Sequence, residues 1–235
     1  MSDLPRDDAL SELQWPEPPA PPDRLSASIR KECTQNLKAR RGLTATQRVL
    51  LSVLLSALVV GVLTYLSAGR SRPDGALRAA LFGAAGWGLV QAAVLGVGLA
   101  RPPGKRVSRS FRLIVAVAVP VLFLAYLALA ASTRLPLGEF FHGHHAGGAV
   151  GCGLHALLFG AIAAGGTLFV WRGTDPLTPG LSGALAGLVG GLAGAAAIGV
   201  ACPSGETWHL WIGHGVAVLL LVLAGFLVGR KWLAP

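Results

Sequence analysis

The residues in this sequence that could do chemistry are cysteines and histidines, and they gather in its second half. All six histidines and two of the three cysteines lie between residues 142 and 214. The set consists of His142, His144, His145, Cys152, His155, Cys202, His209 and His214. Thiolate and imidazole are soft-to-borderline donors that suit zinc or copper. We therefore expect a metal or redox site in this part of the chain.

The spacing of these residues favours one set of four. Cys152 and His155 are three residues apart and share a helical face, and Cys202 and His209 flank a short polar turn. Together they could form a Cys₂His₂ metal site. The alternative ligands are His144, His145 and His214. A disulfide between Cys152 and Cys202 is the competing use of the same sulfur atoms, so redox state could control metal binding. A pH-responsive or transport role, or no role at all, completes the alternatives.

No pattern typical of an enzyme accompanies these residues. The sequence contains no Ser/His/Asp nucleophile motif, phosphate-binding loop or HExxH helix. It also lacks the CxxC pair used in disulfide exchange. We therefore expect no catalytic residues.

The composition indicates a protein that crosses a membrane several times. Hydrophobic residues make up 53% and charged residues 13%, against about 25% charged residues in soluble domains. Because a charge inside a bilayer is costly and a spanning helix needs about 20 residues, stretches without Asp, Glu, Lys or Arg predict the spans. Six are predicted, at 49–69, 79–100, 113–133, 149–171, 181–201 and 207–229. The expected fold is all-α and polytopic, with a six-helix transmembrane domain over 49–230.

The basic residues predict that both ends of the chain are cytoplasmic. Sixteen of the 20 Lys and Arg residues fall on the side of the termini and four on the other side, and cytoplasmic loops carry such an excess. The net charge of +9 is therefore a topology signal and gives no reason to expect nucleic-acid binding. The cysteines and histidines between 142 and 214 would then face the extracytoplasmic, oxidising side.

The first 48 residues are predicted to form a cytoplasmic segment of two parts. Residues 1–23 are acidic and Pro-rich, and cannot bury enough apolar surface to fold alone. Residues 24–41 predict a basic amphipathic helix, because four residues spaced by four lie along one face. These residues are Leu25, Ile29, Cys33 and Leu37. Such a helix could lie on anionic lipid or in a partner's groove. Leu10, Leu13 and Trp15 form a second candidate contact.

The predicted fifth span contains two rows of glycines, each spaced by four residues. Gly183, Gly187 and Gly191 form one row, and Gly190 and Gly194 form a second. Small residues let helices approach closely. The rows predict packing within the chain, with homodimerisation as the alternative.

Residues 180–233 contain a Gly/Ala-rich helix ending in Cys-Pro, a polar turn, a Trp-containing restart and a Leu/Gly-rich helix ending in Gly-Arg. The residues that mark this pattern are Cys202, Pro203, Trp208, Trp211, Gly229 and Arg230. With this pattern, the sequence resembles the six-span bacterial anti-sigma factors related to the negative regulator of sigma F. Cys152 resembles the family's other extracytoplasmic cysteine.

The resemblance implies a multi-pass anti-sigma factor of the bacterial inner membrane. Its cytoplasmic segment would hold an extracytoplasmic-function sigma factor away from RNA polymerase, with Leu25, Ile29 and Leu37 as the expected contact. A metal or redox signal at the extracytoplasmic cysteines and histidines would shift the bundle and release the sigma factor. The competing hypothesis is a metal-binding or metal-transporting membrane protein that acts alone.

Overall fold

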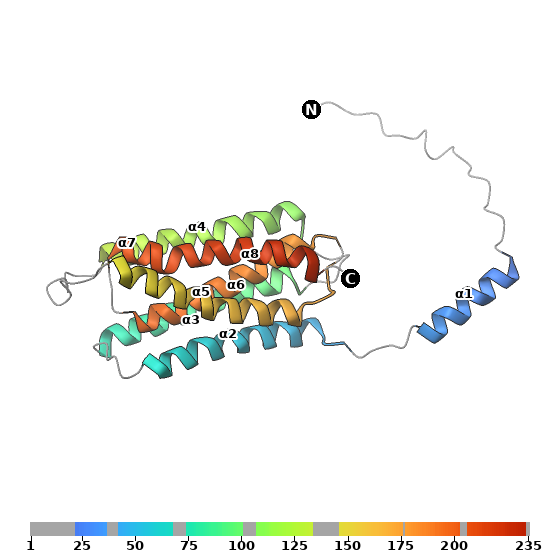
Figure 1. The fold of residues 1–235 in the computed structure, drawn as a ribbon, viewed down its shortest axis with the longest axis horizontal. Helices are drawn as coiled ribbons and strands as arrows, with labels where there is room; N and C mark the ends of the chain where they lie inside the picture. Colours follow the sequence, from blue (N-terminus) through green and yellow to red (C-terminus); the bar gives the residue numbers. More distant parts are fainter. Residues whose placement is uncertain are drawn as a thin grey trace, which may run out of the picture. The chain divides into compact units, whose positions relative to one another are not determined.

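The computed structural model contains helices and no strand in the residues that it describes. Those residues are 22–36, 42–67, 74–100, 107–133, 146–175, 177–202 and 206–233. The chain divides into two compact units, residues 1–42 and 43–235. The first unit contains α1 (Asp23–Asn36). The predicted all-α fold class is confirmed (Figure 1).

The second unit contains the six long apolar helices that the composition predicts. The first five are α2 (Ala45–Ser67), α3 (Asp74–Gly98), α4 (Arg109–Thr133), α5 (Ala146–Val170) and α6 (Pro179–Ala201). The last consists of α7 (Thr207–Leu210), a π-helical turn η4 (Trp211–Gly215) and α8 (Val216–Trp232). In the described ranges, six helices are long and apolar enough to cross a membrane.

Most of these helices begin a few residues before the predicted spans. In α2, α3 and α4 the residues before the predicted span include charged ones, such as Arg48 in α2 and Arg78 in α3. A search for charge-free stretches leaves those residues out. For the same reason, the boundary predicted between residues 48 and 49 falls inside α2.

α6 is the central helix of the second unit. It contacts α2, α3, α4, α5 and α8, and 19 of its 23 residues are buried. Its sequence is built mainly of Gly and Ala, whose small side chains let neighbouring helices come close on every side. The outer helices expose large apolar side chains, such as Leu54 of α2 and Leu122 of α4, as a lipid-facing surface requires.

The two predicted glycine rows pack against different helices of the same chain. A Cβ atom at Gly183 or Gly187 would meet backbone atoms of α8. A Cβ atom at Gly190 or Gly194 would meet backbone atoms of α5. These rows are therefore covered inside the molecule, and a homodimer would need another surface.

We expect the substitution Gly187→Val to prevent stable packing of α6 against α8. The new Cβ atom would collide with the carbonyl oxygen of Leu221, and backbone cannot move aside as a side chain can. The cost should reach the upper end of overpacking, about 3 kcal/mol or more. The measurement is the yield and thermal stability of the purified protein in detergent.

The matched control is Gly199→Ala in the same helix, since a Cβ placed there has no atom within 4 Å apart from the adjacent backbone of its own helix. It should fold normally and gain up to about 1 kcal/mol from helix propensity. Similar losses in both variants would show that position 187 is not specially constrained.

The two ends of the bundle differ in what they contain. At the first, which we call the entry end, the indole of Trp171 after α5 donates to Ser52 Oγ in α2 at 3.2 Å. There too, the backbone N–H of Asp175 donates to the carbonyl of Leu233, just after α8, at 3.3 Å. α2 begins at this end, where Arg48 donates to the Val170 carbonyl at the end of α5. The opposite end contains the start of α5, the end of α6 and α7.

Candidate thiol–imidazole site

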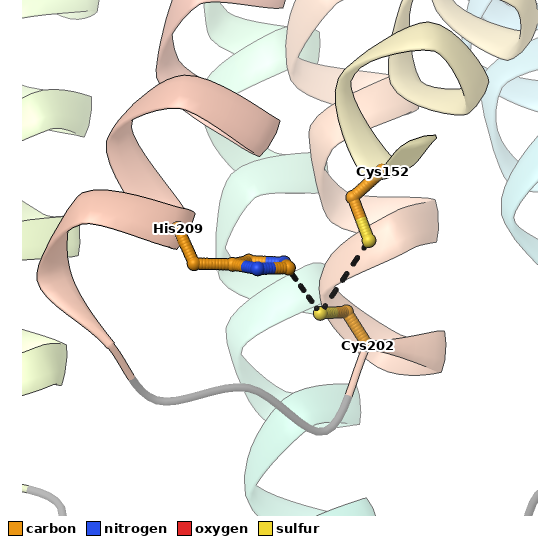
Figure 2. A group of neighbouring side chains, drawn as sticks. All are labelled: Cys152, Cys202 and His209. Carbon is orange, nitrogen blue, oxygen red and sulfur yellow. Dashed lines mark hydrogen bonds between the residues drawn. The ribbon is translucent and has the colours of Figure 1, made fainter. Parts of the chain in front are cut away.

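Three of the predicted site residues lie together at the end of the bundle opposite the entry end. Cys152 Sγ lies 3.7 Å from Cys202 Sγ, and Cys202 Sγ lies 3.1 Å from His209 Nε2. The three ligand atoms all lie within 4.8 Å of one another. Figure 2 shows Cys202 between the other two side chains. Cys202 and His209 are buried, and Cys152 is half-buried. We call these three residues the thiol–imidazole group.

The end of α6 and the start of α7 place Cys202 and His209 beside each other. Pro203 follows Cys202 in the sequence, and the residue before a proline disfavours the helical region. Cys202 accordingly has an extended backbone and ends α6, with its N–H donated to the Ile198 carbonyl at 2.7 Å. Glu206 is also extended and begins α7. The start of α7 thus lies beside the end of α6, and His209 reaches the Cys202 sulfur.

A glycine in η4 lets α5 bring Cys152 to the same place. A Cβ atom at Gly213 would lie 3.1 Å from the Ala149 carbonyl oxygen and 3.2 Å from Cys152 Cβ. Both distances are tight for a real side chain. The absence of a side chain at this position therefore permits the close approach of η4 to α5.

We expect Gly213→Val to separate Cys152 from Cys202 and to slow formation of a disulfide between them. A strain of about 1.4 kcal/mol, within the range for overpacking, would reduce the population of the reactive arrangement about tenfold. The measurement is the rate of disulfide formation in the full chain with a mild oxidant, followed by thiol alkylation and mass analysis.

Gly151→Ala serves as its control, because a Cβ there has no neighbour within 4 Å although it adjoins Cys152. It should react at the wild-type rate. A wild-type rate in Gly213→Val as well would contradict the role given to Gly213.

The group can support either of the two chemistries predicted from its residue types. A disulfide requires the sulfur atoms to close to about 2.05 Å, with loss of two electrons and two protons to an oxidant. Two thiolates at about 2.3 Å from one tetrahedral zinc ion lie about 3.7 Å apart, which is the separation of the Cys152 and Cys202 sulfurs. The residues therefore fit a metal ion, and His209 Nε2 would be a third ligand.

His155, a member of the predicted four-residue set, does not join the group. Its side chain is exposed, and its Nδ1 lies 2.8 Å from the Gly151 carbonyl oxygen of the preceding turn. A spacing of three residues leaves side chains about 60° apart around a helix. That rotation turns His155 outward while Cys152 faces Cys202.

Of the remaining predicted ligands, His214 lies within the described residues. His214 lies in η4 and is almost completely buried, at 1% exposure. Its ring centroid is 6.1 Å from that of His209. His144 and His145 lie outside the described residues, as does His142.

Of the predicted partner contacts, Ile29 is the one whose side chain the structure describes. It lies in α1 and is 52% exposed, so it is accessible to a partner. Leu25 also lies in α1. The others, Leu10, Leu13, Trp15 and Leu37, lie outside the described residues.

A buried polar network at the entry end was not anticipated from the sequence. The Arg112 guanidinium forms a salt bridge with the Asp175 carboxylate at 3.3 Å, donates to Thr178 Oγ1 at 2.6 Å and bonds Ser182 Oγ. Asp175 Oδ1 also accepts the Thr178 N–H at 3.0 Å. Arg112 and Asp175 are only 3% and 1% exposed. The network joins the start of α4 to the turn between α5 and α6.

One signal in the sequence pointed to this network. Asp175 is the only acidic residue between the predicted fourth and fifth spans. An acidic side chain just before a helix that begins with proline commonly accepts backbone N–H groups.

Comparison with known proteins identifies a family. The sequence model of the family described as negative regulator of sigma F matches residues 25–234. The matched range includes most of α1 and all six long helices. No curated protein and no solved structure matches significantly.

Proposed function

Since the chain belongs to the family of negative regulators of sigma F, we propose that it is an anti-sigma factor of the bacterial inner membrane. It holds an extracytoplasmic-function sigma factor through its cytoplasmic segment and keeps it from RNA polymerase. A metal or redox change at the thiol–imidazole group on the other side of the membrane releases it.

The observation that carries this proposal is the arrangement of α5 between the two ends of the bundle. Cys152 lies near its start, and Trp171 directly follows its end. The Trp171 indole donates to Ser52 in α2, and the Arg48 guanidinium lies 5.9 Å from the Trp171 ring centroid. The cytoplasmic segment continues directly into α2. A displacement of α5 caused at Cys152 therefore reaches the helix that carries that segment.

The chemistry of α1 suits a protein partner. Ile29 exposes an apolar side chain, and the adjacent Arg30 and Lys31 are exposed as well. An apolar stripe flanked by charges is the form in which helices enter hydrophobic grooves. To change sigma occupancy substantially, the signal must favour the releasing state of the bundle by a few kcal/mol.

The competing hypothesis, a metal-transporting membrane protein that acts alone, has less support than the anti-sigma proposal. In the parts of the chain that the structure describes, the Cys and His ligand atoms that lie together form one group at one end of the bundle. That distribution favours a fixed site over a path through the membrane.

The proposal is tested with Ile29→Asp in the full chain, compared with Ala27→Asp. Both variants add one negative charge to an exposed position of α1, but two residues correspond to about 200° of rotation, so Ala27 faces away from the stripe. Ile29→Asp should reduce the sigma factor recovered with membranes and raise expression from its target promoter. Ala27→Asp should change neither. Equal sigma retention in both variants would contradict binding through this stripe.

A further inference from the structure

The π-helical turn η4 places two histidines closer together than a regular helix would. His209 and His214 are five residues apart, which corresponds to about 140° of rotation on an α-helix. In η4 the Val216 N–H donates to the Trp211 carbonyl, five residues earlier, and this wider turn reduces the rotation per residue. The two imidazole rings consequently lie 6.1 Å apart.

The His214 side chain presents a buried nitrogen without a hydrogen-bond partner. Its Nδ1 lies 3.4 Å from the Ala195 carbonyl oxygen, so Nδ1 carries the proton and donates it. Nε2 then carries the lone pair, and among the described residues no group bonds it. A buried polar atom left unsatisfied is costly. Metal-binding histidines commonly donate one ring N–H to a backbone carbonyl and coordinate through the other nitrogen.

The position of Ala195 relates His214 to the thiol–imidazole group. Ala195 precedes Cys202 by seven residues in α6, which is about two helical turns, so both lie on the same face of that helix. His214 thus contacts the side of α6 that carries Cys202, but at a point about two turns, or about 10 Å, along the axis from Cys202. Its ring nitrogens are not among the three ligand atoms that lie within 4.8 Å of one another. An ion that bound all four residues would therefore have to draw the π turn toward Cys202. His209 contacts Cys202 directly and also neighbours His214.

We propose that His214 Nε2 is the fourth ligand of a Cys₂His₂ site for a soft or borderline metal ion, together with Cys152, Cys202 and His209. This inference rests on the proposed sensing role of the thiol–imidazole group and adds η4 to it. The two thiols lose their protons when the ion binds. Oxidation to a disulfide involves the sulfur atoms alone, whereas a metal ion also engages the π turn of the last span. The site therefore distinguishes a metal ion from an oxidant.

The test titrates the purified full chain with Co²⁺ as the probe and records its visible absorption. Tetrahedral coordination by two thiolates and two imidazoles should give intense bands in the wild type. His214→Gln keeps a buried polar side chain without an imidazole. It should weaken Co²⁺ binding by at least the roughly 10–100-fold that follows from changing a residue that only supports a metal ligand. His155→Gln, an exposed histidine outside the group, should bind as the wild type does. Wild-type affinity in His214→Gln would overturn the inference.

A second measurement does not depend on the folding of a variant. X-ray absorption spectroscopy of the Co²⁺-loaded wild type should give two sulfur and two imidazole ligands. Two sulfurs, one imidazole and an oxygen ligand would overturn the assignment of His214.

Failure of this inference can be distinguished from failure of the proposed function. If the wild type binds no Co²⁺ but an oxidant joins Cys152 to Cys202 and releases the sigma factor, the fourth-ligand proposal falls and the anti-sigma proposal stands. If neither metal nor oxidant releases the sigma factor, the proposed signalling function fails whatever the Co²⁺ spectrum shows.

Discussion

A chain with serine at both Cys152 and Cys202 should keep its sigma factor bound under conditions that release it from the wild type. Serine nearly preserves the size of the side chain, but it forms no disulfide and is a poor ligand for a soft metal ion. The measurement is expression from the sigma-dependent promoter with and without added metal or oxidant. The induced level should fall to the uninduced level, while repression without the signal is unchanged.

His155→Gln is the control for this prediction, because it changes a neighbouring residue of α5 that lies outside the thiol–imidazole group. It should retain wild-type induction. Normal induction in the double serine variant would place the sensing residues elsewhere in the chain.

Asp175→Ala should destabilise the bundle by about 3–5 kcal/mol, because it leaves the Arg112 charge buried without its counter-ion. The change also removes the acceptor for the Thr178 N–H at the start of α6. The measurements are the thermal stability and the yield of folded protein in detergent. The entry end should loosen as well, so we expect higher promoter activity without the signal.

Two further variants make this prediction specific. Arg172→Ala changes an exposed residue of the same turn and should cost under about 0.5 kcal/mol. The double change Arg112→Met with Asp175→Leu removes both charges and should regain much of the lost stability, as apolar replacements of buried ion pairs often do. If Asp175→Ala were as stable as Arg172→Ala, the buried salt bridge would contribute little.

The six helices were predictable because lipid imposes a simple rule on the sequence. Each span must satisfy its backbone hydrogen bonds within a helix and avoid charge over most of its length. The central position of α6 did not follow from hydropathy, since its value of 1.9 lies within the range of the other spans. Its Gly and Ala content indicated close packing but could not identify which helices pack against which row.

The site was predictable only in part. The sequence indicates which residues could bind a metal ion and near which membrane face they lie, but not which way each helix is rotated in the bundle. Cys152 and Cys202 were recognisable as thiols near the same predicted membrane face, and His209 as a nearby imidazole. The outward position of His155 depends on how α5 is rotated in the bundle. The π turn depends on tertiary packing, since a Cβ at Gly213 would press on α5 and one at Gly215 on Leu124 of α4.

The entry-end network was missed for a different reason. Counting Arg112 as a loop charge gave the predicted topology but hid its role inside the bundle. α4 begins at Arg109, so Arg112 lies in its first turn and is enclosed by the turn between α5 and α6.

The central claim is that chemistry at the thiol–imidazole group controls a sigma factor on the opposite side of the membrane. The most direct test treats spheroplasts with Cd²⁺ or with an oxidant that cannot cross the membrane, and then measures the sigma factor that remains with the membrane fraction. The wild-type chain should lose most of its bound sigma factor, and the chain with serine at Cys152 and Cys202 should lose none. Retention by the wild type, or equal release from both chains, would contradict the account.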